Sequence, residues 1–142
     1  MIDMSHDDAD EPLGYLLHRL TTALRAEVTS IALEPVGVSF PQYICMRILS
    51  QYPGRSNAEL AREVMVSPQA MNIVVRGLQD RQLVARPATV AAGRSLPAEL
   101  TRDGRALLRQ IDEHVREAER RVLEPLTPAQ RTDFKELLGA LS

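Results

Sequence analysis

The stretch Ser56–Arg86, SNAELAREVMVSPQAMNIVVRGLQDRQLVAR, decides the fold of this chain. Its pattern predicts two short helices joined by a tight turn, with a strand directly after the second. Ser56 is placed to cap the first helix, and Glu59 completes a capping box. Ser67 and Pro68 open the second helix, because a capping hydroxyl followed by proline is a typical helix start.

The second of these helices has one apolar and one polar face. Its apolar stripe has the helical spacing i, i+3, i+4, i+7 and consists of Met71, Val74, Val75 and Leu78. The opposite face carries Gln69, Ala70, Asn72, Ile73 and Arg76. Amide and guanidinium groups on a short helix suit the major groove of DNA, where they bond base edges. The plainer alternative is a helical hairpin with a solvated face.

Length and composition indicate one globular domain. The chain has 142 residues, of which 44% are hydrophobic and 25% charged. The acidic N-terminus MIDMSHDDADE is not a secretory signal or transit peptide, so we expect a cytoplasmic protein without a membrane segment. The single cysteine, Cys45, excludes an internal disulfide framework. No metal, phosphate-loop or nucleophile–base motif is present, so we expect neither an enzyme nor a cofactor.

The formal net charge of −2 hides an uneven distribution. Residues 55–109 hold nine arginines and five acidic residues, whereas residues 1–11 hold five acidic residues and no Lys or Arg. Positive charge is thus concentrated around the predicted helix pair, as phosphate binding requires. All but one of the seventeen cations are arginine. This favours bidentate contacts, although a GC-rich genome would produce the same bias.

The remaining sequence predicts a mainly α fold with a small β-hairpin. We expect a disordered acidic tail over residues 1–10 and one domain over 11–142. Long apolar helices occupy 11–34 and 101–142 and flank a lobe at 39–100 whose hairpin strands are 83–86 and 95–100. Ser39, Thr101 and Thr127 are the expected helix caps. The long stripes favour a homodimer; the alternative is that the two helices cover each other within a monomer.

Five segments, in this order, resemble the MarR-type (multiple-antibiotic-resistance repressor) regulators. They are GVSFPQY at 37–43, SNAELA at 56–61, VSPQAMN at 66–72, LQDRQLVAR at 78–86 and LTRDG at 100–104. The resemblance covers about residues 11–142. It implies a homodimeric winged helix-turn-helix protein whose terminal helices form the dimer interface. The helix at 67–83 would enter the major groove of a pseudo-palindromic operator, and the hairpin, or wing, would reach the adjacent minor groove.

Two positions depart from the family pattern. Ala92 stands where the wing usually has an aspartate that orients the arginine at Arg94. The expected wing contact is weakened by this loss, whereas the helix contact is not affected. Gln82 stands where glycine is frequent, so it must adopt a left-handed or otherwise permitted turn conformation.

The predicted DNA-contacting residues follow from these patterns. On the helix they are Ser67, Gln69, Ala70, Asn72, Ile73 and Arg76, and elsewhere Arg94 for the minor groove and Arg86 and Arg55 for phosphates. Ser67 also suits a phosphate contact at the helix N-terminus. Ile73 either meets a thymine methyl or packs inward. For the three arginines outside the helix, a solvated side chain is the alternative.

The resemblance also implies repression that a small aromatic or anionic effector relieves. A pocket between the first two helices and the lobe would be lined by some of Tyr15, His18, Tyr43 and Arg47. Equally, Arg47 would bridge to an acid and both tyrosines would be core residues. Cys45 is expected to be buried and inert, with redox sensing as the alternative.

The overall prediction is a sequence-specific, homodimeric DNA-binding transcriptional regulator, with repression as the expected mode and activation still open. The alternative is a winged-helix dimer that binds protein and has weak or no affinity for DNA. A salt-dependent shift of duplex DNA separates the two.

Overall fold

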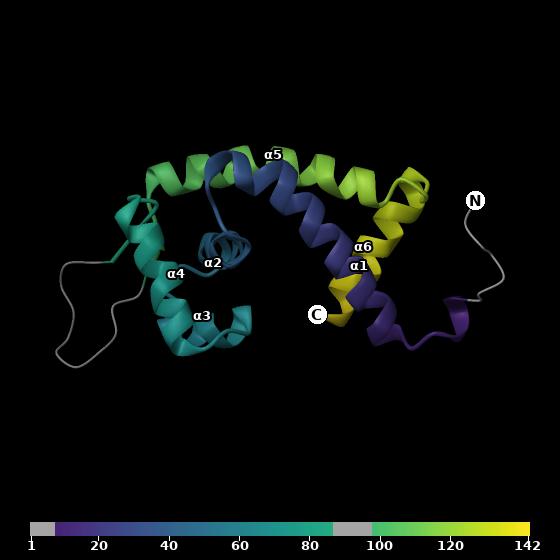
Figure 1. The fold of residues 1–142 in the computed structure, drawn as a ribbon, viewed down its shortest axis with the longest axis horizontal. Coiled ribbons are helices and arrows are strands. Elements are labelled where there is room, and N and C mark those ends of the chain that lie inside the picture. Colours follow the sequence, from purple (N-terminus) through teal and green to yellow (C-terminus); the bar gives the residue numbers. More distant parts are fainter. Residues whose placement is uncertain (1–7, 87–97) are drawn as a thin grey trace.

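The computed structural model describes residues 8–86 and 98–142, which form one helical body (Figure 1). In chain order the α-helices are α1 (Leu13–Val28), α2 (Phe40–Gln51), α3 (Asn57–Val64), α4 (Pro68–Asp80), α5 (Arg102–Val122) and α6 (Pro128–Leu141). Strands β1 (Val84–Ala85) and β2 (Glu99–Leu100) pair antiparallel, with Val84 opposite Leu100. This confirms the predicted fold class.

The long helix α5 connects the two ends of the molecule. In Figure 1 it runs along the whole upper edge, with α3 and α4 toward one end of the molecule and α6 toward the other. The core lies around α2, which packs against α4, α5 and the helical turn that follows α1. Its fully buried side chains are Leu33, Cys45, Met46, Leu49, Leu60, Met71, Val75, Leu78 and Ile111.

Side-chain caps start the helices where the sequence predicts them. Ser39, Ser56 and Thr127 each complete a capping box with the residue three positions later. Ser67 and Thr101 accept a hydrogen bond from the third N–H of their helices, α4 and α5. These caps depend on local sequence alone, which is why the sequence predicts them well.

The helix ends differ more from expectation. The first long helix leaves α-geometry after Val28 and continues as a π-helical turn (Thr29–Leu33) and a 3-10 turn (Glu34–Val36). The predicted helix at 67–83 is shorter, since α4 ends at Asp80. Asp8–Asp10 form a 3-10 turn rather than part of a disordered tail; residues 1–7 lie outside the described residues.

The turn at Gln82 and two hydrogen bonds from Arg81 fix the C-terminal end of α4 in the lobe. Gln82 has φ 59°, so it adopts the left-handed conformation that the sequence requires of it. The guanidinium of Arg81 donates to the carbonyl oxygens of Val36 and Gly37 at 2.9 and 3.0 Å. These bonds tie the end of α4 to the turn before α2, and so position the helix against the lobe.

Candidate nucleic-acid interface

The two faces of α4 have separate environments. Met71, Val75 and Leu78 are completely buried against the lobe. Gln69, Asn72 and Arg76 are exposed on the opposite face, and Ala70 is half-buried beside them. One side of α4 is therefore occupied by the core, whereas the other offers polar groups to a partner.

Ile73 and Ser67 complete this outward face. The side chain of Ile73 is 74% exposed, so the alternative that it packs inward is wrong. The hydroxyl of Ser67 accepts the Ala70 N–H at 3.1 Å. Its own proton remains available to donate, and the N-terminal end of the helix dipole favours an anion beside it.

Beside this face lies a polar hollow of about 330 Å³. It is lined by Asn57, Asn72, Arg76, Gln79 and Arg86, from α3, α4 and the end of β1. Sequence reasoning missed Asn57 and Gln79. Gln79 was detectable, because Asn72, Arg76 and Gln79 follow the i, i+4, i+7 spacing of one helix face. The contribution of Asn57 depends on how α3 packs against α4, which sequence spacing does not reveal.

A chain of hydrogen bonds crosses the hollow. A terminal N–H group of Arg86 donates to Asn57 Oδ1 at 2.8 Å, and Asn57 Nδ2 donates to Asn72 Oδ1 at 2.6 Å. Arg86 is therefore half-buried and held beside α4. Its predicted phosphate contact must be made from this position.

Arg55 is engaged by acidic neighbours. Its guanidinium lies 2.7 Å from Glu59 and 3.5 Å from Glu63, and 4.8 Å from the centre of the Tyr52 ring. The hydrogen bond from Arg55 is the main reason that the pKa of Glu59 is lowered, and the same bond raises the pKa of Arg55. Because two carboxylates offset its charge, Arg55 is not among the phosphate contacts that we retain. Arg94 and Ala92 lie outside the described residues.

The four predicted effector residues do not meet in one pocket. Tyr15 and His18 line a hollow along α1, whereas Tyr43 lines another hollow between α1, α2 and α5. Arg47 pairs with Asp112 of α5, as its alternative interpretation anticipated, and lies 5.9 Å from the centre of the Tyr43 ring. Sequence reasoning missed Arg25 and Phe40, which also line the Tyr43 hollow. The guanidinium of Arg25 lies 4.7 Å from the centre of the Phe40 ring.

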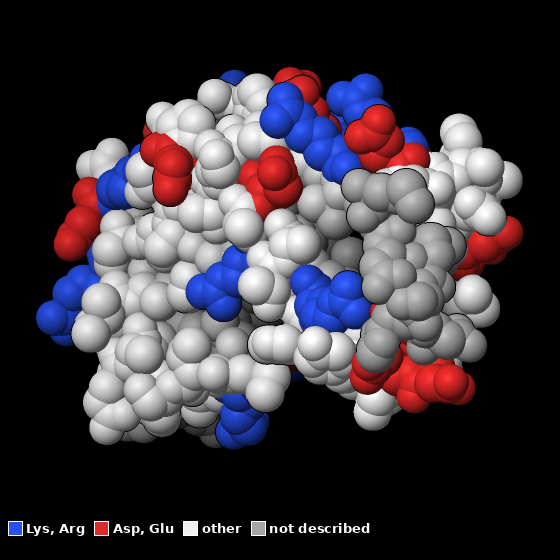
Figure 2. Space-filling model, turned by 45° about the vertical axis from the view of Figure 1, so that its right-hand side comes forward, with Lys and Arg blue, Asp and Glu red and all other residues white. Residues whose placement is uncertain are grey.

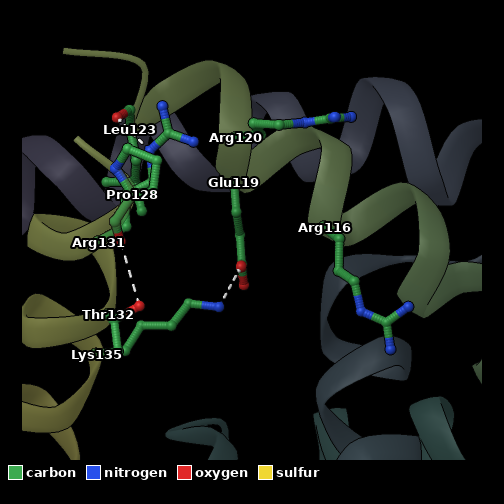
Figure 3. A pocket seen from close by; sticks show the side chains of 8 residues that line it. All are labelled: Arg116, Glu119, Arg120, Leu123, Pro128, Arg131, Thr132 and Lys135. Carbon is green, nitrogen blue, oxygen red and sulfur yellow. Dashed lines mark hydrogen bonds and ion pairs between the residues drawn. The ribbon is translucent and has the colours of Figure 1, made fainter. Parts of the chain in front are cut away.

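A fourth hollow lies between the end of α5 and α6 (Figure 3). Lys135 reaches from α6 to Glu119 of α5 at 2.7 Å. Arg131 Nε donates to the carbonyl oxygens of Leu123 and Leu126, each at 3.1 Å. These contacts fix α6 against the end of α5. This hollow is at the opposite end of the molecule from α4 (Figure 1), so we assign it no part in the interface.

The remaining chemistry is sparse. Within residues 8–86 and 98–142, no three His, Cys, Asp or Glu side chains gather as a metal ion would require. Cys45 is buried, and this burial raises its pKa to about 12. None of the helices in the described ranges is long and apolar enough to cross a membrane. On the face shown in Figure 2, acidic and basic side chains are mixed, and neither sign of charge forms one large patch.

Comparison with known proteins identifies this arrangement. Residues 38–95 match the model of the MarR family. The transcriptional repressor Rv2887 of Mycobacterium tuberculosis is 54% identical over 132 residues, which cover 93% of this chain and 94% of that protein. The chain belongs to the MarR family. A repressor of Mycobacterium bovis, Mb2911, has the same identity and coverage.

Solved MarR-family structures have the same fold. Rv2887 in complex with salicylic acid has a TM-score of 0.81 and 53% identity, and covers 94% of this chain and 99% of its own. Rv2887 in complex with DNA has a TM-score of 0.80 and 50% identity, with the same coverage. Wild-type MarR of E. coli, at 20% identity and a TM-score of 0.80, covers 92% of this chain and 97% of its own and supports the fold alone.

Proposed function

We propose that two copies of this chain form a two-fold dimer that binds operator DNA and represses transcription. The observation that carries the proposal is the outward face of α4, where Gln69, Asn72 and Arg76 are exposed while the opposite face is buried. Rv2887, which shares about half of its residues with this chain, has been solved with DNA. We place the dimer in the cytoplasm with its operator.

Each outward side chain has a chemical counterpart in the major groove. Amides and guanidinium groups bond base edges, and the exposed Ile73 suits the methyl group of thymine. Ser67 at the start of α4 and Arg86 beside it suit phosphates. We retain Arg94 as the minor-groove contact of the wing.

The second copy is needed because α6 has no buried residue of its own. Leu137 and Leu141 are 65% and 82% exposed, and Leu13 and Tyr15 of α1 are also more than half exposed. Burying such a surface against an identical copy would place two α4 helices on one duplex. Family architecture supports this pairing through the terminal helices.

A DNA titration at several salt concentrations tests the regulator directly. Duplex fragments selected from the source genome are expected to bind with an affinity that falls steeply with salt, because phosphate contacts release counterions. Selected sites are expected to be pseudo-palindromic. Absence of binding at low salt would reject the regulator and favour the alternative, a protein-binding dimer of the same fold.

We further propose that an aromatic carboxylate releases the repressor. Rv2887 has been solved with salicylic acid and with p-aminosalicylic acid. In this chain the hollow of about 220 Å³ beside Arg25, Phe40 and Tyr43 combines a cation with two aromatic rings. A guanidinium pairs with a carboxylate through two parallel hydrogen bonds, and the rings flank the aryl group.

Salicylate and its neutral analogue salicylamide separate charge recognition from ring packing. Salicylate is expected to raise the melting temperature and release the operator, and Arg25→Gln to remove both effects. Salicylamide is expected to do neither, because it lacks the carboxylate that Arg25 pairs with. An Arg25→Gln protein that responds like the wild type would exclude this hollow as the effector site.

A further inference from the structure

The hydrogen-bond chain from Arg86 to Asn72 has a direction that chemistry alone fixes. A guanidinium group has five N–H donors and no acceptor. The atom of Asn57 that faces Arg86 must therefore be its oxygen, and this bond is 2.8 Å long. Once Asn57 Oδ1 faces Arg86, its Nδ2 must face Asn72.

The same logic orients Asn72. Because Asn57 offers an N–H group at 2.6 Å, the atom of Asn72 that receives it is Oδ1. The NH₂ group of Asn72 then points away from Asn57. Asn72 is exposed on α4 and lines the polar hollow with Arg76 and Gln79, so its NH₂ group is available to a partner that approaches this face of α4.

This orientation changes which base Asn72 can read. An unrestrained asparagine pairs with adenine by accepting from N6 and donating to N7. With one lone pair of Oδ1 taken by Asn57 and the oxygen turned toward that residue, the NH₂ group is the part of the Asn72 side chain best placed to meet a base. Guanine, with acceptors at N7 and O6, and thymine, with O4, match it, whereas the exocyclic amine of cytosine opposes it.

We propose that Asn57 and Arg86 are specificity-determining positioning residues that set Asn72 as a hydrogen-bond donor to the operator, favouring guanine or thymine at one position of each half-site. The inference rests on the proposed DNA-binding function and adds the base class that one side chain selects. Neither Asn57 nor Arg86 needs to touch that base. They act by fixing which end of the Asn72 amide group is turned toward the DNA.

Asn57→Asp reverses the chain without removing it. The aspartate has two acceptors, so Arg86 can still donate to it, while Asn72 must turn its NH₂ group toward Asp and its oxygen toward the DNA. An acidic residue in the first turn of α3 also suits the helix dipole, so the variant is expected to fold. The preferred base is expected to change from guanine or thymine to cytosine or adenine.

Base preference is measured by competition among operator duplexes that vary one base pair at a time. The wild type is expected to favour guanine or thymine over cytosine at one position by about fivefold, the cost of an unmatched hydrogen bond. Asn57→Asp reverses that order, and Asn72→Ala abolishes it at the same position. Gln51→Glu matches the charge change at an exposed site on α2 and is expected to weaken all duplexes equally. An unchanged preference in Asn57→Asp overturns the proposal.

A measurement without DNA checks the hydrogen-bond chain separately. Asn57 and Asn72 are the only asparagines of the chain, so [15N]asparagine labelling gives two side-chain amide signals by NMR. Asn72→Ala is expected to shift the Asn57 signal, whereas Gln69→Ala, on the same face, leaves it in place. An unmoved Asn57 signal in Asn72→Ala overturns the chain itself. If the Asn57 signal shifts in Asn72→Ala as expected but the wild-type protein has no affinity for operator DNA, the proposed function is wrong, and the specificity role fails with it.

Discussion

Helices α4 and α6 are nearly equal in length, at 13 and 14 residues, but differ in how they are packed. In α4, Met71, Val75 and Leu78 are buried completely within the chain. In α6 no residue is buried, and Leu141 is 82% exposed. The lobe that holds α4 is therefore complete within one chain, whereas the α6 end exposes apolar side chains that a second chain would cover.

The largest expected effect breaks this contrast at the α6 end. Replacing Leu137 and Leu141 together with Asp should weaken dimerisation at least about 100-fold, because each buried leucine contributes about 1.5–3 kcal/mol. Light scattering across a dilution series measures the shift, and operator affinity should fall with it. Ala129→Asp, on the exposed first turn of α6, is the control. If the double variant dissociates at the same protein concentration as the wild type, α6 is not part of the dimer interface.

The second effect tests how the α4 lobe is joined to α5. Gly104 is buried, and a Cβ there would overlap the backbone carbonyl oxygen of Leu83. Gly104→Ala should therefore lower the free energy of unfolding by about 3 kcal/mol, as overpacking against rigid backbone does. Gly139 of α6 has nothing within 4 Å of the same added atom. Gly139→Ala should instead stabilise by about 0.5–1 kcal/mol. Equal effects in urea unfolding would contradict the contrast between the two ends.

A third effect concerns the outward face of α4 alone. Arg76→Ala should weaken operator binding by about 1–3 kcal/mol if Arg76 reads a base, without altering the unfolding free energy. Arg109→Ala removes an exposed arginine from α5 and should leave affinity within twofold. A gel shift that Arg76→Ala does not change would exclude Arg76 from the interface.

The smallest effect is a pH dependence of the core. Burial raises the pKa of Cys45 to about 12, so the folded protein retains the thiol proton that the unfolded chain loses above pH 9. The contribution of Cys45 to stability is complete below pH 9 and declines as pH rises toward 12, by about 1.4 kcal/mol per pH unit. Urea unfolding of wild type and Cys45→Ala from pH 7 to 10 should show their stability difference changing only above pH 9. Rapid labelling of the native thiol at pH 8 would show that it is accessible.

Local sequence predicted much of the fold but less of the site. The caps at Ser39, Ser56, Ser67, Thr101 and Thr127 were all confirmed, because each depends on residues within one helical turn. The sequence placed the end of the first helical segment near Glu34, as observed, but the change from α-helical to π-helical geometry after Val28 was not predicted.

The site depends on contacts between residues far apart in sequence. The outward face of α4 followed from helical periodicity. The pairing of Asn57 with Asn72 and of Arg47 with Asp112 depends on side-chain placement that spacing does not encode. For the same reason the sequence did not show that Tyr15 and His18 line a different hollow from Tyr43. The two hollows lie along different parts of α1.

The most direct test of the account is a hydroxyl-radical footprint of the protein on an operator selected from genomic fragments. Two outward-facing α4 helices in a two-fold dimer predict two protected half-sites whose centres lie about 10–10.5 base pairs, or a multiple of that, apart. Arg76→Ala should weaken the protection of both half-sites equally. A single protected site, or a footprint that survives loss of Gln69, Asn72 and Arg76 together, would contradict it.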